Sequence, residues 1–167
     1  MTSSFDTLAK ALRARGQRVS FAESCTGGLV SARLAALPGI SDVYNGAIVA
    51  YANAVKTEIL DVSESLLRQL GAVSTPVALA MARGAKKKLH TDWAASITGI
   101  AGPSGGTPQK PVGTVCFAIV GPGLEWSLTT HFDGDRAAIQ DQSAKFVVDA
   151  LQTALDQGAE GLARMGL

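Results

Sequence analysis

The segment R-V-S-F-A-E-S-C-T-G-G, residues 18–28, decides the fold of this chain. Its first six residues alternate between polar and apolar side chains, as a short β-strand does. Residues 27–37 then have helical spacing and end before Pro38. A strand that turns directly into a helix is typical of the crossover units that build parallel sheets, so this segment predicts an α/β fold.

Outward from this segment, helices and strands are predicted to alternate along the chain. Helices are expected over residues 4–15, 63–70 and 76–88, and a last helix after Asp133 or Asp135. Strands are expected over residues 43–51, 93–97, 114–120 and 126–132, and the last two are joined by the hairpin sequence G-P-G-L-E. The order predicts a three-layer α/β/α sandwich whose mixed central sheet includes a C-terminal antiparallel hairpin.

The composition bounds the class of protein. With 167 residues, 47% of them hydrophobic, the chain is expected to be a single ordered domain over residues 1–167, with residues 159–167 as a frayed tail. A net charge of +1 argues against nucleic acid or an anionic membrane as a partner. The start of the chain lacks a signal-peptide pattern, and its two cysteines do not make a disulfide scaffold or a metal cluster. A cytoplasmic location is therefore expected.

The turn after the first strand is the best place for a nucleophile. Ser24 and Cys25 are both candidates, because a sharp turn exposes a side chain and N–H groups of a first helical turn stabilise an oxyanion. The structural alternative is a capped helix start whose glycines allow close packing. For Cys25, the structural alternative is a small packing residue.

A serine nucleophile needs a base, and three residues are candidates for it: His90, His131 and Lys56. His90 follows a lysine run at a helix end and His131 lies near a strand end, so neither has the context of a catalytic triad. Lys56 follows an apolar strand, where burial would favour its neutral form, as Ser–Lys enzymes require. A surface position is the structural alternative for Lys56.

Two further segments indicate a ligand site. The glycine- and proline-rich stretch of residues 98–112 is long for a compact domain, and its N–H groups could hold a phosphate or close over a ligand. Arg136 in F-D-G-D-R begins a helix, where its guanidinium and the helix dipole suit phosphate. A flexible connector and an exposed arginine are the respective structural alternatives.

Six strings in this order resemble the CinA C-terminal-domain family, the nicotinamide-nucleotide amidohydrolases. They are A-E-S-C-T-G-G (22–28), Y-A-N-A-V-K (51–56), G-A-V-S (71–74), S-I-T-G-I-A-G-P-S-G-G (96–106), K-P-V-G-T-V (110–115) and F-D-G-D-R (132–136). The resemblance covers residues 8–155 and is closest to a stand-alone form of the domain.

The resemblance implies that the chain hydrolyses the carboxamide of nicotinamide mononucleotide to nicotinic acid mononucleotide and ammonia, in pyridine-nucleotide recycling. It implies a homodimer, with no metal and no cofactor. Ser24 corresponds to the nucleophile and Lys56 to the general base, and Tyr51 and Thr98 to further catalytic residues. The substrate-binding residues implied are Thr26, Gly27, Ser41, Gly99, Gly102 and Arg136.

In the expected mechanism, Lys56 takes the Ser24 proton, and Tyr51 bonds Lys56 or relays that proton. The oxyanion is held by N–H groups of residues 25–27 or by the Thr98 hydroxyl. Two other functions stay open at this point. One is a non-catalytic nucleotide-binding or regulatory module linked to competence or DNA damage. The other is a hydrolase that uses Cys25, since a helix N-terminus lowers the pKa of a thiol.

Overall fold

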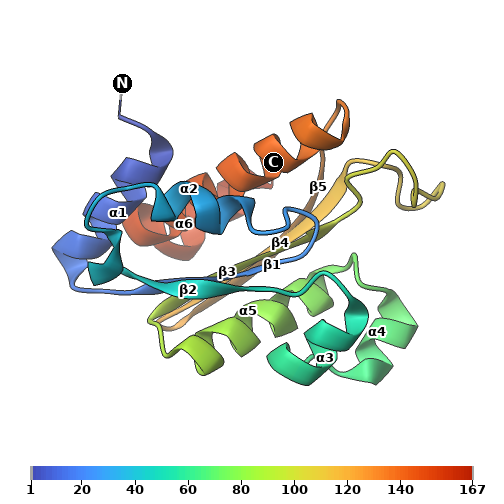
Figure 1. The fold of residues 1–167 in the computed structure, drawn as a ribbon, viewed down its shortest axis with the longest axis horizontal. Helices are drawn as coiled ribbons and strands as arrows, with labels where there is room; N and C mark the ends of the chain where they lie inside the picture. The colour runs from blue at the N-terminus through green and yellow to red at the C-terminus, as the bar shows by residue number, and fades with distance from the viewer. Residues whose placement is uncertain (1, 167) are drawn as a thin grey trace.

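The computed structural model describes residues 2–166 and consists of three layers around a five-stranded sheet (Figure 1). The strands are β1 (Val19–Glu23), β2 (Tyr44–Val49), β3 (Trp93–Gly99), β4 (Thr114–Gly121) and β5 (Leu124–His131). The helices are α1 (Ser4–Arg15), α2 (Leu29–Ala35), α3 (Asn53–Leu60), α4 (Glu64–Leu70), α5 (Thr75–Leu89) and α6 (Arg136–Met165), with a short 3₁₀ helix, η1 (Ile40–Asp42). Helices α1, α2 and α6 cover one face of the sheet, and α3, α4 and α5 cover the other.

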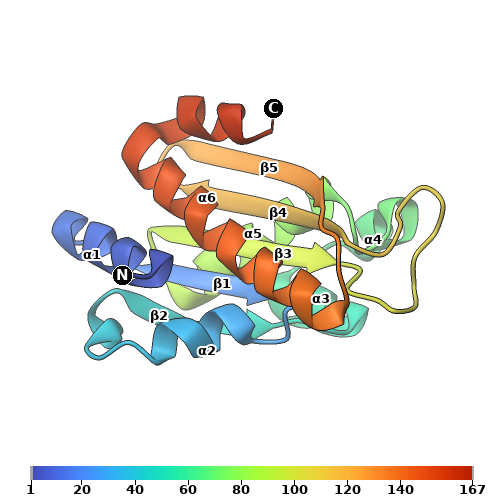
Figure 2. The same ribbon diagram turned by 90° about the horizontal axis from the view of Figure 1, so that it is seen from above.

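The sheet is mixed, in the order β2-β1-β3-β4-β5. Strand β1 is parallel to both of its neighbours, β2 and β3, whereas β4 is antiparallel to β3 and to β5. Seen from above, α6 crosses the sheet diagonally over all the central strands (Figure 2). The predicted α/β/α sandwich with a C-terminal antiparallel hairpin is confirmed.

Strand β1 is buried on both faces, although its sequence alternates between polar and apolar side chains. All five of its residues are buried, including the polar ones. Ser20 meets the hydroxyl of Thr91 at 2.7 Å, and Glu23 accepts hydrogen bonds from the chain that follows it. A central parallel strand is covered by helices on both sides, so its polar residues are internal structural groups rather than a solvent face.

Three helix predictions need correction. Helix α3 was missed because its eight residues follow Ala52, an N-cap residue that offers no side-chain cap. Helix α2 begins at Leu29 rather than Gly27, since Gly27 and Gly28 have positive φ angles of 59° and 104°. Residues 159–165 are not a frayed tail: they belong to α6, which bends at Gly158 and buries Leu162 against the core.

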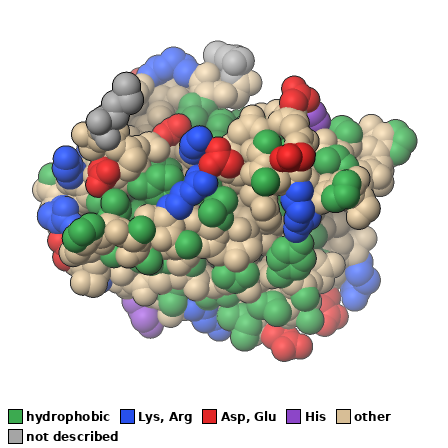
Figure 3. Space-filling model, turned by 45° about the horizontal axis from the view of Figure 1, so that its top comes forward, with side chains coloured by type: hydrophobic (Ala, Val, Ile, Leu, Met, Phe, Trp, Pro, Cys, Tyr) green, Lys and Arg blue, Asp and Glu red, His purple; other side chains and the backbone are tan. Residues whose placement is uncertain are grey.

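The surface fits the near-neutral composition. On the face drawn in Figure 3, basic and acidic side chains are interspersed among hydrophobic and uncharged ones. Within residues 2–166, no helix combines the length and the apolar character needed to span a membrane.

Candidate active site

Strand register places the predicted catalytic residues at one edge of the sheet. Glu23 at the end of β1 lies beside Val49 of β2 and Ile97 of β3. The backbone continues this alignment, because the Ala50 N–H donates to the Glu23 carbonyl at 2.8 Å and the Ser24 N–H donates to the Ile97 carbonyl at 2.9 Å. The carboxyl ends of three parallel strands therefore meet here, the edge at which α/β sheets place ligands.

Lys56 approaches Ser24 from α3. Its Nζ lies 3.0 Å from Ser24 Oγ, 2.9 Å from the Ala50 carbonyl oxygen and 3.1 Å from that of Tyr51. The Lys56 side chain is 1% exposed and Ser24 is 8% exposed. The surface alternative for Lys56 is excluded, and the predicted base and nucleophile are in direct contact.

The environment of Lys56 favours its neutral form. Burial lowers the pKa of Lys56, because a low-dielectric site disfavours the charged ammonium. A neutral amine has two N–H donors and one lone pair. The two carbonyl oxygens, of Ala50 and Tyr51, account for both donors and leave the lone pair for the Ser24 hydroxyl.

The environment of Cys25 argues against a nucleophilic role. Burial raises the pKa of the Cys25 thiol to about 12, with its largest cause the loss of solvation. The thiol is 5% exposed and belongs to the main hydrophobic core. The helix-dipole argument for a reactive thiol fails because Cys25 lies in a turn four residues before α2 begins.

Glu23 organises the turn that follows Ser24, a role that the sequence analysis missed. Its carboxylate is fully buried and accepts hydrogen bonds from the Thr26 hydroxyl at 2.7 Å and from the N–H groups of Gly28 at 2.9 Å and Ser31 at 2.8 Å. The N–H of Val30 lies 3.3 Å from it. Glu23 therefore occupies the N–H groups of Gly28, Val30 and Ser31 around the start of α2, while the Leu29 N–H donates to the Thr26 carbonyl. A buried acidic residue directly before a glycine turn is the signal that could have indicated this.

Two N–H groups in the turn meet no oxygen acceptor in the described part of the chain. Within residues 2–166, neither the Cys25 nor the Thr26 N–H meets a carbonyl or side-chain oxygen. Both residues are buried, at 5% and 4% exposure. Buried N–H groups are normally paired, so unpaired ones directly after a serine are suited to an oxyanion. Of the polar groups of Thr26, the N–H is the one suited to an oxyanion, since the hydroxyl donates to Glu23.

The role of Gly27 in this turn is conformational. Its N–H donates to the Ser24 carbonyl at 3.0 Å, and its φ of 59° is one that residues other than glycine rarely adopt. Gly27 therefore closes the turn that holds Ser24 in place.

Tyr51, Arg136 and the glycine loop form a second cluster at the same edge. One Arg136 nitrogen donates to the Gly102 carbonyl and another to the Tyr51 hydroxyl, both at 2.8 Å. The Tyr51 side chain is exposed, and it is its backbone carbonyl, not its hydroxyl, that contacts Lys56. The expected hydrogen bond between Tyr51 and Lys56 is present through the Tyr51 backbone carbonyl, while the Tyr51 hydroxyl accepts from Arg136.

Thr98 and Gly99 end β3 beside the dyad. The Thr98 hydroxyl donates to the Ala72 carbonyl at 2.9 Å, so its proton is engaged in joining β3 to the loop before α5. A Cβ on Gly99 would lie 2.8 Å from a methyl of Val115 and 2.9 Å from the Thr114 carbonyl. Glycine at this position is explained by the close approach of β4.

Ser41 lies away from the dyad. It belongs to η1, before the start of β2, and its carbonyl accepts from the Arg18 guanidinium at 2.6 Å. Arg18 precedes β1, whereas Ser24 follows it, so a strand length of roughly 16 Å separates the two serines. Within one chain, Ser41 is not brought to the site.

The two histidines are also remote from Ser24. His90 caps the end of α5, and the Nε2 of His131 lies 3.0 Å from the Val112 carbonyl oxygen. Within residues 2–166, no three residues of the His, Cys, Asp and Glu types are grouped so as to hold a metal ion. A cleft of about 440 Å³ lies between α3 and α4, on the side of α3 away from Lys56, and includes Asn53, Thr57 and Arg68.

The sequence and the fold are similar to those of known proteins. The family model of the CinA C-terminal domain matches residues 2–155. The chain belongs to the CinA C-terminal-domain family. A solved CinA superfamily protein from Klebsiella pneumoniae has 35% identity and a TM-score of 0.88, with 91% of this chain and 95% of that chain covered. One from Escherichia coli has 35% identity and a TM-score of 0.86, covering 89% of this chain and 87% of that one.

The sequence relatives are longer proteins. A CinA-like protein of Anaeromyxobacter dehalogenans is 48% identical over 150 residues, which is 90% of this chain and 37% of the relative. One from Parasynechococcus marenigrum is 49% identical over 148 residues, 86% of this chain and 35% of the relative. The chain thus spans about a third of the length of these relatives, and it matches the solved CinA domains over nearly their whole length.

Proposed function

We propose that this CinA domain is an amidohydrolase that removes ammonia from the carboxamide of nicotinamide mononucleotide by a Ser–Lys mechanism. The observation that carries the proposal is the buried Lys56 Nζ, 3.0 Å from Ser24 Oγ. The lowered pKa of Lys56 supports it, since a general base must be unprotonated near the working pH. The nucleotide substrate follows from the family resemblance.

In the acylation step, Ser24 Oγ forms a bond to the carboxamide carbon while its proton passes to Lys56 Nζ. The carbonyl oxygen becomes an oxyanion, which the N–H groups of Cys25 and Thr26 are free to bind. The carbon–nitrogen bond then breaks as Lys56 returns the proton to the departing ammonia. An ester on Ser24 remains.

In the deacylation step, Lys56 takes a proton from water as the water oxygen attacks the ester carbon. The same N–H groups bind the second oxyanion. When the carbon–oxygen bond to Ser24 breaks, the proton on Lys56 returns to Ser24 Oγ, and the carboxylic acid leaves. The cycle needs no metal and no cofactor.

Arg136 is expected to hold the negatively charged end of the nucleotide. Its guanidinium is fixed at the mouth of the site by Gly102 and Tyr51. An arginine positioned in this way suits a phosphate, because its fork of N–H donors matches the phosphate oxygens. The exposed Tyr51 ring beside it offers an aromatic surface for the nicotinamide ring or ribose.

The experiment is a measurement of ammonia release from nicotinamide mononucleotide, nicotinamide riboside and nicotinamide. The wild type should prefer the mononucleotide, and Ser24→Ala should lose activity at least 10³-fold. Ser65, an exposed serine in α4, supplies the matched control Ser65→Ala, which should keep wild-type activity. Turnover of Ser24→Ala close to that of the control would overturn the proposal. Saturable binding of the nucleotide without product would instead support a non-catalytic binding module.

A further inference from the structure

We propose that Gln140 of α6 is a positioning residue that aims the oxyanion-binding N–H of Thr26. The inference rests on the proposed function, because it assigns a role within the Ser24 acylation step. Gln140 lies outside the six strings that carry the family resemblance, and its contact is with the backbone of the turn. Its Nε2 donates to the Cys25 carbonyl at 2.9 Å, from a helix more than one hundred residues away in sequence.

The geometry of a peptide unit gives this contact its consequence. In a trans peptide, the C=O and the N–H of one planar unit point in opposite directions. The Cys25 carbonyl and the Thr26 N–H belong to the same unit. By holding the carbonyl, Gln140 sets the direction of the N–H, and that N–H meets no oxygen acceptor within residues 2–166.

The neighbouring peptide unit is arranged in the same way. The Ser24 carbonyl accepts from the Gly27 N–H at 3.0 Å, which fixes the direction of the Cys25 N–H. Among the described residues, two consecutive units therefore have an anchored carbonyl and an N–H that meets no oxygen acceptor. The first anchor is local to the turn, whereas the second depends on the Gln140 side chain.

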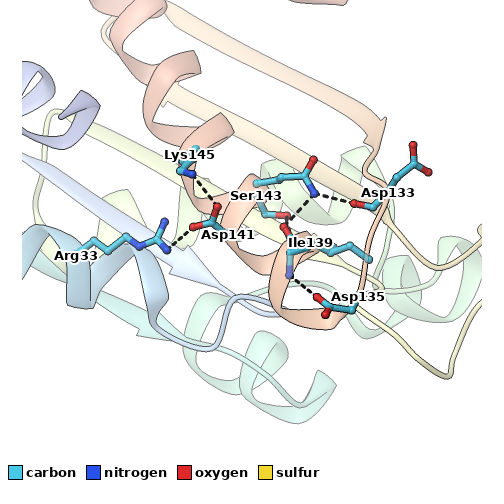
Figure 4. A network of polar contacts seen from close by, with 9 residues as sticks. Arg33, Asp133, Asp135, Ile139, Asp141, Ser143 and Lys145 are labelled. Atoms are coloured by element: carbon cyan, nitrogen blue, oxygen red, sulfur yellow. Dashed lines mark hydrogen bonds and ion pairs between the residues drawn. The ribbon is translucent and has the colours of Figure 1, made fainter. Parts of the chain in front are cut away.

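Helix α6 is itself fastened next to Gln140. Asp141 accepts from Arg33 of α2 at 2.5 Å and from Lys145 at 2.8 Å, as Figure 4 shows. The hydrogen bonds from Lys145 and Arg33 lower the pKa of Asp141. The start of α6 is also capped by Asp135, which accepts from the Ala138 N–H at 2.9 Å. Gln140 thus extends from a fixed stretch of helix toward the turn after Ser24.

The side-chain chemistry at position 140 is specific. The Cys25 carbonyl needs a donor, and glutamine supplies one without adding charge. A glutamate would present two acceptor oxygens to the carbonyl and repel it. A methionine would keep the length and volume and supply no donor. An arginine would restore an N–H donor, so it separates the donor function from the identity of the residue.

The test compares Gln140→Met, Gln140→Glu and Gln140→Arg with wild type in ammonia release. Gln152→Met is the matched control, because the half-buried Gln152 lies further along the same helix and donates to Asp156, not to the turn. The methionine and glutamate variants should lose about tenfold to a hundredfold in kcat with KM within twofold, since an aimed oxyanion donor acts in the transition state. Gln140→Arg should recover most of kcat, and the control should match wild type.

A second readout separates this inference from the proposed function. An alkyl fluorophosphonate phosphonylates a reactive serine: the Ser24 oxygen bonds to phosphorus, fluoride leaves, and the serine proton passes to Lys56. The reaction uses the same oxyanion donors and no nicotinamide substrate. Its rate at Ser24, followed by peptide mass spectrometry, should fall in the methionine and glutamate variants by the same factor as kcat.

Wild-type kcat and labelling rates in both variants would overturn the role of Gln140 while leaving the amidase proposal intact. A loss confined to KM, or a loss that Gln140→Arg shares in full, would also overturn it. If the wild type releases no ammonia yet labels at Ser24, the amidase proposal fails and the labelling rates alone decide on Gln140. Should Gln140→Met not fold, Gln140→Glu decides, and an unlabelled Ser24 in folded wild type overturns both proposals.

Discussion

At the scale of the residue, Lys56 combines two opposing requirements. Its stem is enclosed by the packing of α3 on α5, while its amine meets the Ser24 hydroxyl and two backbone carbonyls. Burial of an ammonium group is costly, whereas burial of a neutral amine with hydrogen-bond partners is not. The surroundings of Lys56 therefore favour its neutral form, which can act as a base.

The first prediction concerns the pH dependence of activity. The general base works only when Lys56 is neutral, so kcat/KM should rise with pH through the pKa of Lys56 and then level off. Because burial lowers that pKa, the midpoint of the rise should lie below 10.5, the ordinary pKa of lysine. Initial rates in overlapping buffers between pH 6 and 11 measure it. A rate that keeps climbing past about pH 10 would contradict a desolvated Lys56.

The second prediction concerns Cys25. With the pKa of its thiol near 12, Cys25 is protonated at neutral pH, and its replacement by serine should leave kcat within about threefold of wild type. Iodoacetamide at pH 7.5 should likewise leave activity unchanged. Inactivation by iodoacetamide together with an inactive Cys25→Ser variant of normal stability would return the thiol to the mechanism.

At the scale of the element, the turn between β1 and α2 depends on Glu23 more than on helix capping by serine or threonine. One buried carboxylate accepts from the Thr26 hydroxyl and from backbone N–H groups of Gly28 and Ser31. Helix α2 has no side-chain hydrogen bond from its own N-cap, Gly28, so Glu23 performs that role from the preceding strand. This arrangement frees the earlier N–H groups of the turn.

The third prediction follows from that dependence. Glu23→Gln removes the charge and points an amide donor at several N–H donors, so it should lower the free energy of unfolding by about 3 kcal/mol. Glu125→Gln is the matched control: Glu125 forms an exposed ion pair with Arg83, and its loss should cost about 0–1 kcal/mol. Urea unfolding measures both. Equal, small effects would show that Glu23 does not hold the turn.

The elements also show where prediction from sequence succeeds and where it stops. Helix α5 was foreseen from Ser74, Pro76 and the lysines of its last turn, and the structure begins and ends it there. Helix α3 was not, because its eight residues lack a capping side chain and are stabilised by tertiary packing. Ser74 makes no side-chain capping hydrogen bond, so what identified α5 is its sequence pattern, with proline at the start and lysines in the last turn, a pattern that α3 lacks.

The same distinction applies to the site. The contact between Ser24 and Lys56 could be anticipated because both strings follow strand ends, and parallel strands bring such ends together. The roles of Glu23 and Gln140 could not, since each depends on which backbone atoms lie opposite a side chain in three dimensions. For the same reason, the sequence predicts a bond between Tyr51 and Lys56 but not that the Tyr51 backbone carbonyl makes it.

At the scale of the whole molecule, the parallel register of β2, β1 and β3 gathers the site at one edge, and the glycine loop and the start of α6 close around it. This explains why residues between positions 24 and 136 come together. It also separates Ser41, which precedes β2, from Ser24, which follows β1. The homodimer implied by the family resemblance stays a prediction, measurable by sedimentation equilibrium.

The fourth prediction uses that separation. Because Ser41 lies at the opposite edge of the sheet in its own chain, Ser41→Ala should keep kcat/KM within about threefold of wild type. Steady-state ammonia release measures it. A loss greater than tenfold in a folded variant would contradict a site built from one chain and would require a second copy to bring its Ser41 to Ser24.

The most direct test of the central claim is the titration of Lys56 itself. With ¹⁵Nζ- and ¹³Cε-labelled lysine, NMR follows the side-chain amine from pH 6 to 11, and Lys56→Met identifies the signal by its absence. The account predicts that the pKa of Lys56 lies below 10.5, the ordinary value for lysine, and that Ser24→Ala keeps this shift, since burial is its main cause. A Lys56 signal that titrates at or above pH 10.5 would contradict it.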